Sequence, residues 1–261
     1  MIEVSHIYSR FVGMMLIGAR YCNRHKRLVF CTSLFFCILM IFIYKAMNSN
    51  YVQRDEMTYL NRIESVERIG LAAAKTLSLP LVFGAALEHY GFPARVGIAG
   101  LNFLATVLSA VFIFLIVQKW LDSFGLGILA MLAVGVFYQS VEFSLTVLRE
   151  PVYFLCVCMV FWACIDGVSS PNCGWHAFFC GLFCILGFWT RFEGVELLIC
   201  YPLAVFVGFF SENFRCGIAS KKILSFLIGI LSSGLLLAYC LPQYYSFVFG
   251  KVSGYLAVVM K

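Results

Sequence analysis

The sequence predicts an all-α polytopic membrane protein with about seven transmembrane helices and a long, structured first outer loop that carries interfacial helices. Of the 261 residues, 62% are hydrophobic and only 12% are charged, which is about half the charged fraction of an ordinary soluble domain. So few charges cannot cover a water-facing surface, and this excludes a soluble globular protein. The apolar residues also gather in runs that approach the length needed to cross a bilayer.

The first predicted span covers residues 28–44 and follows a basic segment, residues 1–27. No small-residue cleavage site follows the span, so the pattern favours a signal anchor over a removed signal peptide. Basic residues near the first span hold their side of it in the cytoplasm, so residues 1–27 are predicted to be cytoplasmic. The basic residues of this segment are Arg10, Arg20, Arg24, Lys26 and Arg27.

The first outer loop is predicted over residues 45–95, the only long polar connection in the chain. Within it, residues 56–69 are expected to form a helix on the membrane surface, because their apolar side chains share one arc of a helical wheel. These side chains are Tyr59, Leu60, Ile63 and Val66. The apolar patch at residues 77–87 contains Pro80 and is short for a span, so it is expected to be interfacial or re-entrant.

Six further spans complete the predicted core, residues 28–241. They cover residues 96–117, 124–138, 151–165, 177–189, 195–210 and 223–241. Pro151 opens the fourth span of the chain, where proline suits the first helical turn. Glycines in the third span are expected to allow close helix contacts, namely Gly125, Gly127 and Gly135. Residues 242–261 are predicted to form a short outer or interfacial tail.

The distribution of charges, cysteines and histidines argues against a nucleic-acid partner and against a metal centre built from these side chains. The net charge is +6, but no basic stripe with interleaved aromatic residues continues into a soluble domain, so a nucleic-acid partner is not expected. Most of the twelve cysteines lie inside apolar runs, where they act as small hydrophobic residues. The four histidines are dispersed along the chain, and no metal centre is predicted.

Three polar clusters are predicted to lie on the same side of the membrane, because two crossings separate each from the next. They are Asp55-Glu56, Arg149-Glu150 and Arg191 with Glu193. A carboxylate can take a proton from an acceptor, and guanidinium groups can hold a phosphate and stabilise its charge. The clusters therefore indicate one site for a phosphate-linked substrate at the membrane surface. For any single pair, interfacial anchoring is the alternative.

These motifs resemble those of the GT-C glycosyltransferases, which include the protein O-mannosyltransferases and the lipid A aminoarabinose transferases. Asp55-Glu56 followed by Tyr59 is similar to the D-E-x-x-Y start of their first outer loop. Residues 148–151 (LREP) resemble the "tEP" entry to their fourth span. Residues 189–194 (WTRFEG) resemble their "lTRpEG" stretch, with phenylalanine where proline is common. The resemblance covers residues 28–210.

The resemblance implies an inverting transferase at the extracytoplasmic face of a bacterial inner membrane or a secretory-pathway membrane. The donor would be a sugar on polyprenyl or dolichyl phosphate, and the acceptor a glycan, lipid or protein. By analogy, Asp55 is the general base, and Glu56 positions the acceptor or supports the base. Arg149 and Arg191 would face the donor phosphate, supported by Tyr59, Glu150 and Glu193. Some relatives use a divalent metal, and the residues here leave metal dependence open.

Two other functions stay open at the level of the sequence. One is a lipid-carrier binder or transporter without transfer chemistry, which would use the arginines and be indifferent to Asp55. The other is a truncated partner subunit, because GT-C members usually continue with further spans whereas this chain ends at Lys261. A fragment, one half of a split-gene protein and an inactive relative all fit that ending.

Overall fold

The computed structural model describes residues 25–47, 54–69, 78–169, 174–209 and 216–240, and within these ranges all regular structure is helical. Two predicted segments lie outside the described residues: the tail, residues 242–261, and the basic segment except for its last residues, 25–27. The elements are α2 (Lys26–Met47), α3 (Arg54–Ile69), α4 (Leu79–His89), α5 (Ala94–Leu121), α6 (Phe124–Val136), α7 (Tyr138–Ser144), α8 (Glu150–Ser169), α9 (Gly174–Thr190), η2 (Phe192–Glu196), α10 (Leu197–Phe209) and α11 (Cys216–Cys240).

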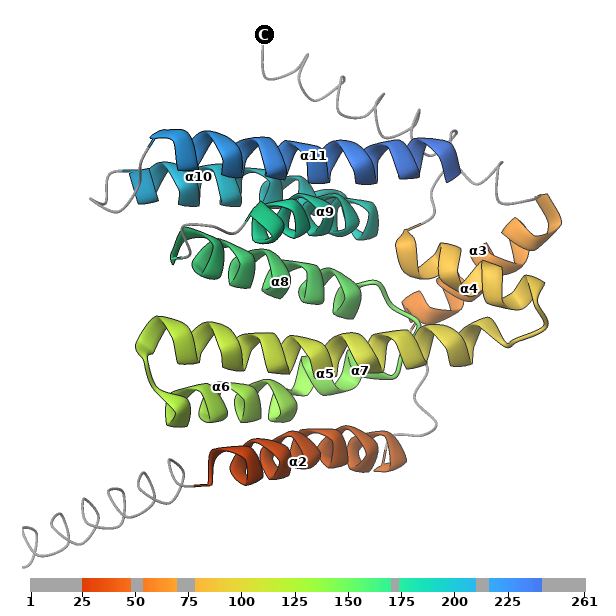
Figure 1. Ribbon diagram of the computed structural model, residues 1–261. Helices are drawn as coiled ribbons and strands as arrows, with labels where there is room; N and C mark the ends of the chain where they lie inside the picture. The colour runs from red at the N-terminus through yellow and green to blue at the C-terminus, as the bar shows by residue number, and fades with distance from the viewer. Residues whose placement is uncertain (1–24, 48–53, 70–77, 170–173, 210–215, 241–261) are drawn as a thin grey trace, which may run out of the picture.

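Among the described residues, three helical segments are long and apolar enough to cross a membrane: α2, α5 and residues Ala219–Leu236 of α11. The long helices lie side by side as a row, in which α2, α6, α5, α8, α9 and α11 each pack on the next (Figure 1). Helix α10 packs against α8 and α9. The short helices α3 and α4 do not extend the row. They lie beside the helix ends on the side where α5 starts (Figure 1). We call this the α3–α4 end.

Helix bounds differ from the predicted spans where the backbone bends inside an apolar run. The predicted span 124–138 ends early, because Phe137 is extended and separates α6 from α7. The predicted span 195–210 begins as the 3₁₀ helix η2 before α10. In contrast, α5 is longer than predicted at 28 residues, or about 42 Å at the usual rise per residue. A continuous apolar run indicates that a segment is buried in lipid or protein. It does not indicate where the helix inside that run is interrupted.

Helices α3, α4 and α5 form a compact corner. The helix predicted at 56–69 is present as α3, and the Pro80 patch forms α4, with the proline in its first turn. Gly91 has a φ of +80°, a conformation that glycine adopts without strain, and it turns the chain from α4 into α5. Glu88 accepts a hydrogen bond from the Ala94 amide at 2.6 Å, which caps the start of α5.

Close approach of helices depends on particular glycines. A Cβ at Gly127 would lie 3.0 Å from the Phe114 carbonyl oxygen of α5, and one at Gly135 would lie 3.0 Å from Cα of Cys37 in α2. The predicted role of these two glycines is therefore confirmed. The prediction for Gly125 is wrong, because a Cβ at this position would meet nothing within 4 Å in the described part of the chain. This face of α6 points away from the neighbouring helices.

The close contact between α9 and α11 yields a stability prediction. A Cβ at Gly229 would lie 2.2 Å from the Phe178 carbonyl oxygen, whereas one at Gly234 in the same helix would meet no described atom within 4 Å. Gly229→Ala is expected to destabilise the protein by about 1–3 kcal/mol, because the helices must move apart. Gly234→Ala is the matched control and is expected to be neutral or stabilising, since alanine favours helix. Thermal unfolding in detergent measures both, and equal melting temperatures would contradict the packing.

At the opposite ends of these helices, away from the α3–α4 end, charged side chains connect α5, α8 and α9. Asp166 of α8 pairs with Lys119 of α5, and His176 Nε2 of α9 lies 2.7 Å from Asp166 Oδ2. Two exposed tryptophans flank this cluster, Trp120 after Lys119 and Trp175 before His176. Exposed tryptophan beside charged residues is typical of a membrane interface. The three helices are thus fixed to one another at this end.

Candidate functional site

Arg149 and Arg191 converge on the carboxylate of Glu150. Arg149 precedes α8 and Arg191 follows α9, so the chain brings together two connections that are about 40 residues apart. Glu150 Oε1 lies 3.8 Å from Arg149 Nε and 3.5 Å from Arg191 Nη1. The structure therefore places these predicted site residues in one cluster.

Glu193 completes this cluster and pairs with Arg191 through both carboxylate oxygens, at 3.3 Å to Nε and 3.4 Å to Nη2. Its pKa is lowered from the ordinary value, because its own backbone amide and the Arg191 side chain donate hydrogen bonds to it. Burial alone would lower the pKa of Arg191, but the hydrogen bond and charge of Glu193 and the charge of Glu150 raise it. Both groups therefore stay charged at neutral pH.

The Arg191–Glu193 pair has a defined pH dependence. Because the pKa of Glu193 is lower in the folded protein, its pairing contributes stability above the unfolded pKa. That contribution is lost as the pH falls through the folded value. The Arg191 guanidinium also lies over the ring of Tyr153, 5.6 Å from its centroid, which holds the planar group in place.

Asn102 fixes the segment that carries Arg149. This residue of α5 is fully buried, and its Nδ2 donates hydrogen bonds to the carbonyl oxygens of Thr146 at 2.6 Å and Leu148 at 2.7 Å. Both carbonyls lie in the connection between α7 and α8. Asn102 was not among the predicted site residues. Its position inside the apolar stretch 96–117 was nevertheless a signal, because a buried side-chain amide needs hydrogen-bond partners.

Replacing Asn102 tests this anchoring. Asn102→Leu keeps the branched arrangement of heavy atoms but removes the donor that both carbonyls share, and we expect a loss of about 1–3 kcal/mol in unfolding free energy. Ser233→Ala is the control, since that buried hydroxyl of α11 donates to the Gly229 carbonyl oxygen of its own helix. An Asn102→Leu protein as stable as the control would contradict the anchoring role.

The turn that carries Arg191 requires Gly194. The Arg191 amide donates to the Gly187 carbonyl oxygen and the Gly194 amide donates to the Arg191 carbonyl oxygen, both at 2.9 Å. A Cβ at Gly194 would lie 2.4 Å from the backbone nitrogen of Phe188. Only glycine lets the chain fold back this closely on the last turn of α9. The glycine that ends the WTRFEG motif thus sets the position of Arg191 and Glu193.

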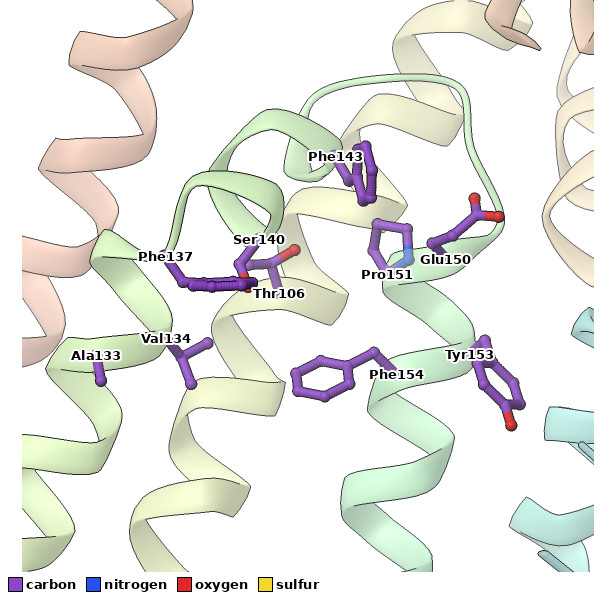
Figure 2. A pocket seen from close by; sticks show the side chains of 10 residues that line it. All are labelled: Thr106, Ala133, Val134, Phe137, Ser140, Phe143, Glu150, Pro151, Tyr153 and Phe154. Carbon is purple, nitrogen blue, oxygen red and sulfur yellow. The ribbon is translucent and has the colours of Figure 1, made fainter. Parts of the chain in front are cut away.

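An apolar cavity of about 450 Å³ lies beside the arginine cluster, between α5, α6, α7 and α8 (Figure 2). Figure 2 shows aromatic and aliphatic side chains around the space and Glu150 at its edge. The volume is within the range of small-molecule sites. The lining residues are Thr106, Ala133, Val134, Phe137, Ser140, Phe143, Glu150, Pro151, Tyr153 and Phe154. Glu150 and Tyr153 therefore belong both to the cavity wall and to the surroundings of Arg191.

The predicted site residues of α3 lie in the neighbouring corner. Glu56 is 1% exposed, and its Oε1 lies 3.0 Å from Arg95 Nε of α5. Tyr59 packs against the buried cluster that joins α3, α4 and α5, and Val147 belongs to this same cluster. Because Val147 precedes Arg149 by two residues, α3 adjoins the segment that carries this arginine. Asp55 is part of α3, but its side chain lies outside the described part of the structure.

Across the described ranges, no three His, Cys, Asp or Glu side chains are grouped so that they could hold a metal ion. Neither a protein-family model nor a curated protein matches this chain. A functional conclusion must therefore come from the arginine cluster, the cavity and the sequence motifs.

Proposed function

We propose that this chain is an integral-membrane glycosyltransferase of the GT-C type, which moves a sugar from a polyprenyl-phosphate donor to an acceptor at the extracytoplasmic face. One observation carries the proposal: Arg149 and Arg191 meet at Glu150, beside an apolar cavity. Paired guanidinium groups match a phosphate, and an apolar cavity matches a hydrocarbon chain. A lipid phosphate combines these two chemistries in one molecule.

In the proposed membrane arrangement the chain crosses seven times, through α2, α5, α6, α8, α9, α10 and α11. Helices α3 and α4 belong to the first outer loop, and the amino terminus is cytoplasmic. The α3–α4 end then faces outward, with exposed Tyr90 and Phe92 at that interface and Trp120 and Trp175 at the other. Helix α6 extends only about 20 Å, and flanking side chains or local thinning of the bilayer would accommodate it.

The proposed reaction assigns roles to four of the predicted residues. Asp55 takes the proton of the acceptor hydroxyl, and the acceptor oxygen forms a bond to the anomeric carbon from the face opposite the phosphate. The bond between that carbon and the phosphate oxygen breaks, and the electron pair leaves with the phosphate. Arg149 and Arg191 stabilise this charge. Glu56 acts as a positioning residue, because its pair with Arg95 holds α3 against α5.

The direct test is turnover of a panel of polyprenyl-phosphate sugars by the purified protein with glycan, membrane-lipid and peptide acceptors. We expect release of polyprenyl phosphate from at least one donor, in an amount equal to the sugar transferred. Donor binding without turnover would instead support the lipid-carrier binder. Turnover that requires a co-purified second protein would support the partner subunit, and absence of both binding and turnover would contradict a lipid-phosphate site.

A further inference from the structure

We infer that the Glu150 carboxylate occupies the phosphate position in the ligand-free protein, and that the donor phosphate binds by displacing it. This inference rests on the proposed function and adds a role that the sequence motifs do not imply. By analogy alone, Glu150 orients the arginines. The contacts of its two oxygens support a different role, as an internal anion that competes with the ligand.

Three donors converge on this one carboxylate. Glu150 Oε2 accepts a hydrogen bond from the Arg149 amide at 3.0 Å. Its Oε1 faces Arg149 Nε at 3.8 Å and Arg191 Nη1 at 3.5 Å. A backbone amide at the start of a helix, together with two guanidinium groups, is a donor set typical of phosphate sites. The carboxylate thus lies where the phosphate of a ligand would find the same donors.

The carboxylate satisfies these donors only in part. Charge-assisted N–H···O bonds are usually about 2.7–2.9 Å long, whereas the guanidinium contacts of Glu150 measure 3.5 and 3.8 Å. Arg149 Nε is buried and has no hydrogen-bond partner among the described residues. A phosphate carries more oxygens than a carboxylate and spreads them in three dimensions. It can therefore reach the donor on Arg149 that Glu150 leaves unsatisfied.

Charge balance favours the exchange. Two arginines and two glutamates leave the cluster without net charge, so an anion that enters beside Glu150 is repelled by it. When the Glu150 side chain turns away, Arg149, Arg191 and Glu193 together carry one positive charge. Glu150 is 30% exposed and lies at the cavity edge (Figure 2), so its side chain can leave the arginines without unwinding α8.

Binding of farnesyl phosphate to the detergent-solubilised full chain tests the exchange, with farnesol as the uncharged control. Glu150→Gln is expected to bind farnesyl phosphate about three- to tenfold more tightly than wild type, because two partly exposed ion pairs no longer compete. Glu150→Ala should shift the affinity in the same direction, which keeps the test valid if one variant folds poorly. Asp122→Asn, which neutralises an exposed carboxylate after the far end of α5, is the matched control and should bind like wild type.

Failure of this inference can be told apart from failure of the proposed function. If binding requires Arg149 and Arg191 but is unchanged or weaker in both Glu150 variants, Glu150 orients the arginines and the inference is wrong. If neither wild type nor the variants bind farnesyl phosphate more tightly than farnesol, the phosphate site itself is wrong, and both conclusions fall together.

Discussion

Asp55→Asn is expected to abolish sugar transfer while leaving donor binding unchanged. Asparagine has nearly the same shape but cannot accept the acceptor proton at neutral pH. Loss of a general base typically lowers the rate by about 10²–10⁴-fold. Single-turnover transfer at saturating donor isolates the chemical step from binding. Donor affinity should stay at the wild-type value, because the arginines lie on other elements of the fold.

The control for this variant is Glu64→Gln, which removes an exposed carboxylate from the same helix, α3. It is expected to transfer sugar at the wild-type rate. Full activity in folded and inserted Asp55→Asn would contradict the assigned base. A carrier binder also predicts an unaffected donor affinity in this variant, so transfer is the readout that separates it from a transferase.

Arg191→Ala is expected to weaken binding of polyprenyl phosphate by about 10- to 100-fold, since a hydrogen bond to a charged group contributes about 1.5–3 kcal/mol. The substitution also leaves Glu150 and Glu193 with only Arg149 to balance them, so the site becomes negative and repels phosphate. Arg191→Lys keeps the charge but loses the planar fork, and it should restore part of the affinity.

Titration with farnesyl phosphate measures these affinities, and the affinity of wild type should fall with added salt. Arg62→Ala removes an exposed arginine of α3 and is the matched control. An Arg191→Ala protein that binds within about twofold of wild type would show that the Arg191–Glu193 pair is a structural ion pair.

The sequence predicted those features that depend on local pattern or on counting membrane crossings. Residues 56–69 form a helix because their apolar side chains recur at helical spacing. Counting crossings predicted that Arg149-Glu150 and Arg191 would share one side, and these residues meet through ion pairs. The shared side of the membrane stays a prediction, because the seven crossings rest on the sequence alone. Counting crossings also gives no distance, and the sharing of one carboxylate follows from the packing of α8 against α9.

Other features depend on partners far apart in the chain. Asn102 bonds to carbonyls more than forty positions later, and Glu56 of α3 pairs with Arg95 of α5, 39 positions later. Nothing in the local pattern of either residue names its partner. The break at Phe137 was likewise hidden, because an apolar run with no polar interruption reads as one helix. This break also borders the cavity beside Glu150, since Val134, Phe137 and Ser140 belong to the cavity wall.

The central claim is that the arginine cluster recognises the phosphate of a lipid whose chain enters the adjacent cavity. Calorimetric titration of the wild-type protein with farnesyl phosphate and with farnesol tests it most directly, because the two ligands differ only in the phosphate. We expect farnesyl phosphate to bind at least about tenfold more tightly at low salt, which corresponds to about 1.4 kcal/mol. Equal affinity for the two ligands would contradict the claim and would leave Arg149, Glu150, Arg191 and Glu193 as a structural ion-pair network.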